Sequence, residues 1–578
     1  MMKPVIDWLK EHGILLSILV LGILLRFLYI HSVPVSSNDD QIHYMLNSQS
    51  FLLSGKDMTG SVTPLDLILF KYPPLESPQA ELPYFLEMFS FSLFGASFFT
   101  SLLPNIILSI LTIVMAYGIG KELINKNVGF IASVLTAINP WSIFIGRTAY
   151  ELVPATFFYM VALYLFLKAK KWAILLTIPF LVLAFYSYIG TKLTLVPFVL
   201  TASIFAYFFI NKRKFLLQYC IVIAAAVLLS GFFFMQISRS DGSRVGELLL
   251  PTNAEIQKQV NDVRRLSLPS PLLSVQTNKL TVYARVLTLN AFNSLSPTYL
   301  FLNGDYFFSQ QRHGLFYFID FAFLLLGIVM LSLKKKKELI FLAVLGLIGL
   351  LPQVLHDPTG NGTFTPHITL LIMVIIIIIS YALDSIITST KRKKRFAVIG
   401  VLSAMYAVLL INFLVVYLTQ APKQAGVFNF PERAAARYVT LAAENNPVVV
   451  FASDPAVSYR NYIFYSGMYS RDNQNIINHA LTKRDKYEID NIKFVSCSGY
   501  IPGEDETIVE QTSCVIKKHG TYLTIAELSG VTPRYAIYQD TLCKKSNVPM
   551  YNNQIRLSDL NVEKYTDATI CKKILSYY

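Results

Sequence analysis

The sequence has few charged residues. Only 15% of its 578 residues are Asp, Glu, Lys or Arg, whereas a soluble domain carries about a quarter. Acidic residues are the scarcer kind, 36 against 50 basic, which gives a formal net charge of +14. Hydrophobic residues make up 54% of the chain, and the mean hydropathy is +0.48. This composition excludes a simple soluble enzyme and leaves two explanations for the basic excess: a nucleic-acid partner, or a membrane with basic loops on one side.

Long apolar runs dominate the first 420 residues. A run of about 20 apolar residues crosses a hydrocarbon core of about 30 Å as a helix. We find eleven such runs, at 13–30, 98–119, 128–145, 152–167, 172–188, 193–210, 215–234, 315–333, 339–355, 367–385 and 396–418. The first run lacks a signal-peptide cleavage pattern, so we expect it to be retained. The sequence predicts a polytopic α-helical membrane protein with about 11 transmembrane helices.

The basic residues lie between alternate runs. Basic residues in short loops stay cytoplasmic. With the N-terminus in the cytoplasm, the inner segments carry 19 basic and 5 acidic residues, an excess equal to the whole net charge. The charge is therefore explained by topology, and a nucleic-acid partner is not expected. An odd number of spans places the C-terminus outside, and the lack of a eukaryotic targeting signal favours a prokaryotic plasma (inner) membrane.

Three outer regions are too long to be turns: 31–97, 235–314 and everything after 419. We divide the chain into a transmembrane catalytic domain, 1–420, and an extracytoplasmic soluble domain, 421–578. In the second, a helix is expected from Pro431 to Asn446, followed by a buried strand at 448–451 and strands around Phe494 and Tyr522. That order predicts an α/β domain.

Four of the five cysteines lie in this outer domain, where thiols can oxidise. They are Cys497, Cys514, Cys543 and Cys571. We expect two disulfides, and the sequence leaves all three pairings open.

The first outer loop contains a candidate helix with two carboxylates at its start. Asn38 stands three residues before Gln41, as in a capping box, and Gly55 is a typical helix stop. A helix over 39–54 is expected, with Ile42, Met45, Leu46, Leu52 and Leu53 facing the membrane surface. Asp39 and Asp40 would begin this helix. Acidic residues at that place also complement the helix dipole, which is the structural alternative to a catalytic role.

Cations accompany these carboxylates at the same depth. Lys71 opens the stiff segment Lys71-Tyr72-Pro73-Pro74. At the outer end of the third span, Arg147 and Glu151 would be neighbours one turn apart on a helix. A simple salt bridge would explain that pair, but charges at a membrane face commonly mark substrate sites. We therefore expect the carboxylates and cations to share one site.

The ordered motifs resemble a known family. They are the acidic pair Asp39-Asp40, Gly55-Lys56-Asp57, Lys71-x-Pro-Pro, Leu93-Phe94-Gly95, Asn139-Pro140-Trp141, Arg147-x-Ala-x-Glu151 and Tyr186-Ser187-Tyr188. This series resembles the GT-C glycosyltransferases, and within them it is similar to the protein O-mannosyltransferase and lipid A aminoarabinose transferase group. The resemblance extends over residues 20–380.

Later residues extend the resemblance. The segment 296–305, ending in Asp305, and Arg312-His313-Gly314 look like the family's third outer loop, and His367 begins a late span. The chain departs from the family pattern in having Asp-Asp where Asp-Glu is commoner, and in lacking an Arg after His367.

The resemblance implies an inverting transfer of a sugar from a polyprenyl-phosphate donor to an acceptor hydroxyl at the outer membrane face. Such chemistry needs a base for the hydroxyl and positive charge for the departing phosphate. Asp39 is the candidate base, and Lys71 and Arg147 are the candidate phosphate ligands. Asp40 and Glu151 would orient the acceptor or the cations, or help to bind a divalent metal ion. Supporting roles fall to Asp305, His313 and His367.

Membrane lipids and a protein, lipid or glycan acceptor complete the expected partners. A transporter or flippase of a lipid-linked sugar is the rival class, and it predicts ionisable residues near the membrane midplane and broken helices in repeated halves. A non-catalytic protein that binds lipid or polymer is a third class.

Overall fold

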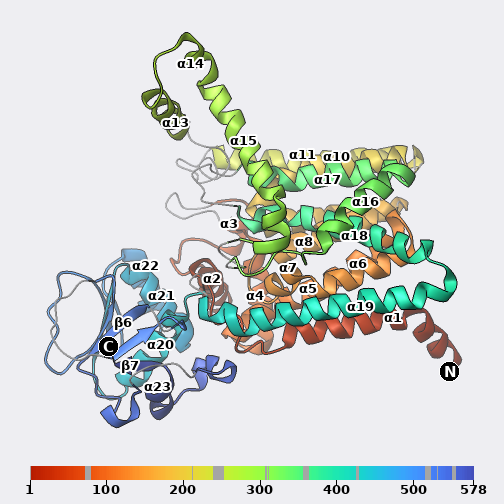
Figure 1. Cartoon of the computed structure of the whole chain (residues 1–578). Coiled ribbons are helices and arrows are strands. Elements are labelled where there is room, and N and C mark those ends of the chain that lie inside the picture. Colours follow the sequence, from red (N-terminus) through yellow and green to blue (C-terminus); the bar gives the residue numbers. More distant parts are fainter. Residues whose placement is uncertain are drawn as a thin grey trace.

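The computed structural model describes most of the chain. The described residues are 2–71, 80–168, 170–210, 213–238, 253–305, 309, 311–355, 363–424, 428–514, 523–529, 532–549 and 555–577. Figure 1 shows long helices lying side by side, with a sheet-containing part at the end of the bundle opposite the N-terminus.

Every apolar run predicted from the sequence is helical. The helices are α1 Met2–Phe27, α5 Phe98–Leu123, α6 Lys126–Ile138 with α7 Pro140–Ile145, α8 Leu152–Lys168, α9 Lys171–Ser187, α10 Ile189–Phe208, α11 Leu216–Ser238, α16 Asp320–Lys334, α17 Lys336–Val354, α18 Thr369–Ser389 and α19 Arg392–Val415. Within the described residues, six helices are long and apolar enough to cross a membrane by length and composition. The chain is therefore a multi-span membrane protein, and the count of about 11 spans stays a prediction.

The bundle is organised around α18. The span Thr365–Ser389, which contains α18, is 83% buried, because α18 packs against α6, α16 and α17. A helix that is apolar on all sides favours such a central place. In contrast, only 11% of the residues in the apolar stretch of the span Arg392–Lys423, which contains α19, are buried within the protein, as expected for a helix whose apolar side chains face lipid. It leads directly from the bundle to the C-terminal part (Figure 1).

Shorter helices form the outer segments. After α1 come α2 Asp39–Ser54, α3 Pro64–Ile68 and α4 Leu82–Phe94, and after α11 come α13 Asn253–Arg265, α14 Pro271–Gln276, α15 Lys279–Leu295 and a π-helical turn, Thr298–Asn303. The helices α13, α14 and α15 project away from the bundle, whereas α2 lies between the bundle and the sheet-containing part (Figure 1). It packs against both α4 and α21.

The C-terminal part is a mixed sheet with helices, which confirms the predicted α/β class. Its elements are α20 Phe430–Ala443, β1 Val448–Ala452, α21 Pro455–Ser466, α22 Gln474–Lys483, β2 Tyr487–Ile489, β3 Ile492–Ser496, β4 Thr507–Gln511, β5 Leu523–Ala526, β6 Pro533–Tyr538, α23 Asp567–Lys573 and β7 Leu575–Tyr577. The strand order is β2-β3-β1-β4-β6-β5-β7, with β1 parallel to β3 and β4 and the other pairs antiparallel. Tyr522 lies outside the described residues, and the strand near it begins at Leu523.

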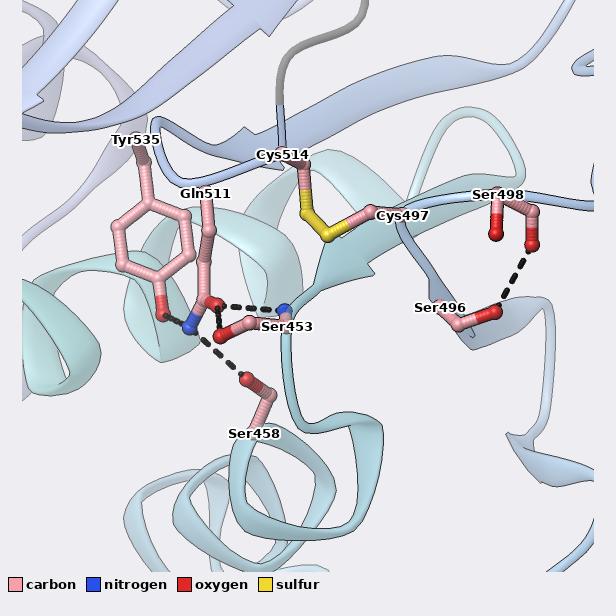
Figure 2. Close-up of a disulfide and its surroundings, with 8 residues drawn as sticks. All are labelled: Ser453, Ser458, Ser496, Cys497, Ser498, Gln511, Cys514 and Tyr535. Carbon is pink, nitrogen blue, oxygen red and sulfur yellow. Dashed lines mark hydrogen bonds between the residues drawn. A yellow bond between two sulfur atoms is a disulfide. The ribbon is translucent and has the colours of Figure 1, made fainter.

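The four outer cysteines form two disulfides, Cys497–Cys514 and Cys543–Cys571. The first joins the segments that follow β3 and β4 (Figure 2). Beside it, the Gln511 side chain accepts from the Ser453 backbone N–H at 2.9 Å and donates to Ser458 Oγ at 3.2 Å. Ser458 belongs to α21, so this amide attaches that helix to the sheet.

Candidate active site

The helix predicted over 39–54 is confirmed as α2. Asn38 caps it, since its side chain accepts from the Gln41 backbone N–H at 2.8 Å, and Gly55 ends it with φ +72°. The prediction that the apolar side of this helix faces the membrane surface is wrong in part. Ile42, Met45 and Leu46 are at most 1% exposed, and they belong to the protein's own hydrophobic core. The apolar side of α2 is used for packing, because α4 and the bundle lie against it.

The two carboxylates that begin α2 face different surroundings. Asp39 Oδ1 accepts hydrogen bonds from Asn429 Nδ2 at 3.0 Å and from Asn461 Nδ2 at 3.3 Å, both in the C-terminal part. Asp40 acts electrostatically on Glu151. Successive residues point about 100° apart around an α-helix. Asp39 therefore contacts the C-terminal part, whereas the charge of Asp40 acts on Glu151 in the bundle.

Glu151 is the centre of a buried polar group beneath α2. The Tyr44 hydroxyl donates to Glu151 Oε2 and accepts from the Ala80 backbone N–H, 2.8 Å away. Burial raises the pKa of Glu151 to about 8, and the negative charges of Asp40 and Glu81 act in the same direction. The bond from Tyr44 acts the other way. Glu151 is therefore mostly protonated at pH 7.

A buried ion pair lies beside this group. Lys192 Nζ is 2.6 Å from Glu81 Oε1 and 2.8 Å from Oε2, and both side chains are at most 3% exposed. Aromatic rings enclose the ammonium, which lies 4.6 Å from the centre of Phe233 and 4.9 Å from that of Phe70. Sequence reasoning missed this pair. A Lys directly before an apolar run, as Lys192 is, was the signal that could have found it.

Arg147 is placed differently from the prediction. Residues 146–151 form turns and extended chain between α7 and α8, so Arg147 and Glu151 are not on one helix. The guanidinium is fully buried and donates to the carbonyls of Leu25, Leu28 and Val33 at 2.9, 2.6 and 2.6 Å. It also lies 5.2 Å from the ring centre of Tyr417. Arg147 thus fixes the backbone that leads to α2, and phosphate binding by it stays a prediction.

A second arginine holds the same backbone from the other side. Arg433 of α20 donates to the carbonyl of Val35 at 2.5 Å and forms an ion pair with Glu563. The Tyr465 hydroxyl accepts from the Ser37 backbone N–H at 3.1 Å. The segment before Asp39 is therefore held by the bundle through Arg147 and by the C-terminal part through Arg433.

Lys71 follows α3 and has an exposed side chain. Its backbone N–H donates to the Asp66 carbonyl at 2.8 Å, and its ammonium has no hydrogen bond or ion pair to a described residue. The rest of the Lys-x-Pro-Pro motif, residues 72–74, lies outside the described residues. Lys71 is thus an exposed cation that is open to an anionic ligand.

The third outer loop brings Asp305 close to the site. Asp305 is 3% exposed, accepts from the Ser309 backbone N–H at 3.0 Å and from the Thr365 hydroxyl, and acts electrostatically on Tyr150. The charges of Asp40 and Glu151 also act electrostatically on Tyr150. The structure therefore brings Asp40, Glu151 and Asp305 around one tyrosine.

The two predicted histidines have different places. His313 is bonded through Nδ1 to the Gly314 carbonyl at 2.9 Å and packs against the Phe413 ring, and burial lowers its pKa to about 4. His367 Nδ1 lies 3.2 Å from Gln353 Oε1, and its ring centre is 6.0 Å from that of Tyr188. His313 packs on α19. His367 lies nearer the polar group around Glu151, since its neighbour Tyr188 is within range of the Glu151 charge.

A carboxylate missed in the sequence lies next to Asp39. Burial raises the pKa of Glu432 to about 7, and the charge of Asp39 adds to this rise. Among the described residues, no group of three or more His, Cys, Asp and Glu is arranged to hold a metal ion. The carboxylates around Asp39 and Glu151 can therefore take part in acid and base chemistry.

Comparisons with known proteins show what the chain is similar to. Residues 79–235 match the family described as dolichyl-phosphate-mannose-protein mannosyltransferase. No curated protein sequence matches the chain. The fold resembles that of ArnT from Cupriavidus metallidurans bound to undecaprenyl phosphate, with a TM-score of 0.52, 9% identity and coverage of 91% of this chain and 98% of ArnT.

A second solved structure is that of the archaeal oligosaccharyltransferase AglB from Archaeoglobus fulgidus, in complex with an inhibitory peptide and a dolichol-phosphate. Its TM-score is 0.48 at 13% identity, with 92% of this chain and 75% of AglB covered. The family match over residues 79–235 and the ArnT-like fold confirm the resemblance seen in the ordered motifs: this chain folds like ArnT, and its residues 79–235 are similar to the dolichyl-phosphate-mannose-protein mannosyltransferases.

Proposed function

We propose that this protein is an inverting glycosyltransferase that moves a sugar from a polyprenyl-phosphate donor to an acceptor hydroxyl. The observation that carries the proposal is the position of Asp39 at the junction of the bundle and the C-terminal part, held by two asparagine amides. The family match and the likeness to ArnT, whose structure contains undecaprenyl phosphate, support the donor class.

In this proposal Asp39 accepts the proton of the acceptor hydroxyl. The oxygen attacks the anomeric carbon from the side opposite the phosphate, and the bond from that carbon to the phosphate oxygen breaks, its electron pair leaving with the polyprenyl phosphate. A single displacement of this kind inverts the configuration. Lys71 stabilises the charge that develops on the phosphate. Arg147 acts through the backbone carbonyls that it binds.

Asp40 and Glu151 take different roles because their charges differ. Asp40 is exposed at the start of α2, and it orients the cations or the acceptor. Glu151, protonated at neutral pH, keeps the bond to Tyr44 without adding a second negative charge near the departing phosphate. A neutral Glu151 would repel an anionic donor less than a charged one.

We assign residues 1–420 to catalysis and 421–578 to an extracytoplasmic domain that faces the acceptor. The N-terminus lies in the cytoplasm, because the basic inter-helix segments then lie inside. The plasma membrane is the proposed location.

The test is sugar transfer from a panel of synthetic polyprenyl-phosphate monosaccharides by purified wild type, Asp39→Asn and the control Asp505→Asn. Asp505 is an exposed carboxylate in the loop before β4. Transfer or slow donor hydrolysis by wild type and the control, with loss in Asp39→Asn, supports the proposal. Donor binding without turnover in wild type contradicts it and favours a transporter or flippase of a lipid-linked sugar.

A further inference from the structure

A cavity lies between part of α2 and the C-terminal part. Its volume is about 320 Å³. His43 and Asn47 of α2 form one wall, and Asp454, Arg460, Arg484 and Tyr487 form the other. These residues come from segments more than 400 positions apart in the chain, so the cavity exists only when the two parts are together.

The two walls are joined by hydrogen bonds. Gln49 Nε2 of α2 donates to the Tyr469 carbonyl at 2.6 Å, and the Tyr469 hydroxyl donates to Ser50 Oγ at 2.8 Å. On the side of α22, Thr482 Oγ1 donates to the Thr59 carbonyl at 3.2 Å. These hydrogen bonds hold the two walls of the cavity together.

The charge that lines this cavity is positive. Arg460 and Arg484 make no hydrogen bond or ion pair with any described residue. The one carboxylate on the wall, Asp454, caps α21 by accepting from the backbone N–H groups of Ala456 and Val457 at 3.0 and 3.2 Å. An arginine is charged at every physiological pH, and its planar group matches a phosphate or a carboxylate. The cavity thus offers two guanidinium groups to an anion.

Residues of both cavity walls are close in the chain to the candidate base and its partner. His43 stands one turn after Asp39 on the same face of α2, about 6 Å along the helix axis. Arg460 precedes Asn461, which donates to Asp39 at 3.3 Å. A molecule whose anionic group binds in the cavity therefore extends toward the carboxylate that would take its proton.

We propose that this cavity binds a phosphate or carboxylate group carried by the glycosyl acceptor, which is an anionic saccharide. The assignment of the anion to the glycosyl acceptor rests on the proposed function, whereas binding of an anion in the cavity does not. The polar and charged walls, of which one comes from the C-terminal part, favour a saccharide over a lipid headgroup.

The experiment measures, by calorimetry, binding of unlabelled tetragalacturonic acid and of its methyl ester, which has nearly the same size and no carboxylate charge. The protein is the full chain in detergent, as wild type, as the double variant Arg460→Gln/Arg484→Gln and as the control Arg471→Gln. Arg471 is exposed between α21 and α22 and does not line the cavity. Donor hydrolysis by the wild type is measured in parallel.

We expect the acid to bind wild type and Arg471→Gln alike, and to bind the double variant at least about 10-fold more weakly, because two charge-assisted contacts are lost. The ester should bind wild type at least about 10-fold more weakly than the acid. Equal affinity for acid and ester in wild type overturns the proposal without reference to any variant.

A second arm identifies the source of the anion. Binding of the acid is repeated in nanodiscs of phosphatidylglycerol and of phosphatidylcholine. Equal binding in both supports a saccharide ligand, whereas loss in phosphatidylglycerol assigns the cavity to a lipid headgroup and overturns the proposal. Anion binding without donor hydrolysis would remove the proposed function alone, and hydrolysis without selective anion binding would remove this inference alone.

Discussion

Asn461 donates a hydrogen bond to Asp39 across 3.3 Å, although the two residues are 422 positions apart in the chain. Asn429 donates to the same carboxylate oxygen at 3.0 Å. Both amides follow the last apolar helix, whereas Asp39 follows the first. The orientation of the candidate base therefore depends on a part of the chain that lies beyond the membrane bundle.

We expect Asn461→Ala to lower kcat by about 10-fold, because a hydrogen bond to a charged group contributes about 1.5–3 kcal/mol. The KM for the donor should not change, since Asn461 lies on the acceptor side. Steady-state kinetics with a polyprenyl-phosphate sugar measures both constants. Asn445→Ala, an exposed asparagine after α20, is the control. An unchanged kcat in Asn461→Ala would contradict the role of this contact.

Lys71→Gln should raise the KM for the donor by about 10-fold, because the phosphate loses one charge-assisted contact. Its Tm should equal that of wild type, since the exposed Lys71 ammonium has no hydrogen bond or ion pair to a described residue. Kinetics and thermal unfolding are measured on the same preparation. Lys56→Gln removes an exposed lysine of the same outer loop and should leave both quantities unchanged.

Arg147→Lys should lower Tm and kcat together. Lysine keeps the charge but cannot reach three carbonyls with a planar group, and each lost bond from a charged donor costs about 1.5–3 kcal/mol. The segment before Asp39 then loses its attachment to the bundle. A variant with a normal Tm and a raised KM for the donor would show instead that Arg147 binds the phosphate.

Glu151 makes stability depend on pH. Its pKa is about 8 in the folded protein, above its ordinary value of 4.5, so the folded state binds the proton more tightly than the unfolded state. The stabilisation is full below pH 4.5 and is lost as the pH rises to about 8. Wild type should lose stability relative to Glu151→Gln in this window, by at most about 1.4 kcal/mol per pH unit. A difference in Tm that does not vary between pH 5 and pH 8 would refute this assignment.

The ion pair between Lys192 and Glu81 should show strong coupling. Removing one partner, as in Lys192→Met, leaves a buried charge and costs about 3–5 kcal/mol. The double variant Lys192→Met/Glu81→Gln should recover part of this loss. Thermal unfolding of the two single variants and the double variant gives the coupling energy. Additive losses would show that the two charges do not stabilise each other.

Local features of the structure could be predicted from the sequence. Asn38, Gln41 and Gly55 define both ends of α2, because capping bonds join residues only a few positions apart. The apolar runs likewise correspond to helices, since the length of a run is a local property. The mixed sheet after residue 448 follows from the alternation of short apolar segments with a helix.

Contacts between distant segments could not be predicted. The pattern in α2 gives an apolar side but not its neighbour, so Ile42 was expected at the membrane and packs in the protein core. The position of Arg147 at the end of an apolar run predicted a substrate ligand. Its partners in the structure are backbone carbonyls, which every residue has and which a sequence pattern therefore cannot reveal. The contact of Asn429 and Asn461 with Asp39 depends on how the two parts of the chain meet.

The hydrogen bond from Arg433 to the Val35 carbonyl limits how the domains of such a protein can be exchanged. A gene fusion that replaced the C-terminal part with an unrelated domain would remove Arg433, Asn429 and Asn461 at once, and the loop before α2 would lose its outer support. The C-terminal part is therefore not an interchangeable module, because the position of the candidate base depends on it.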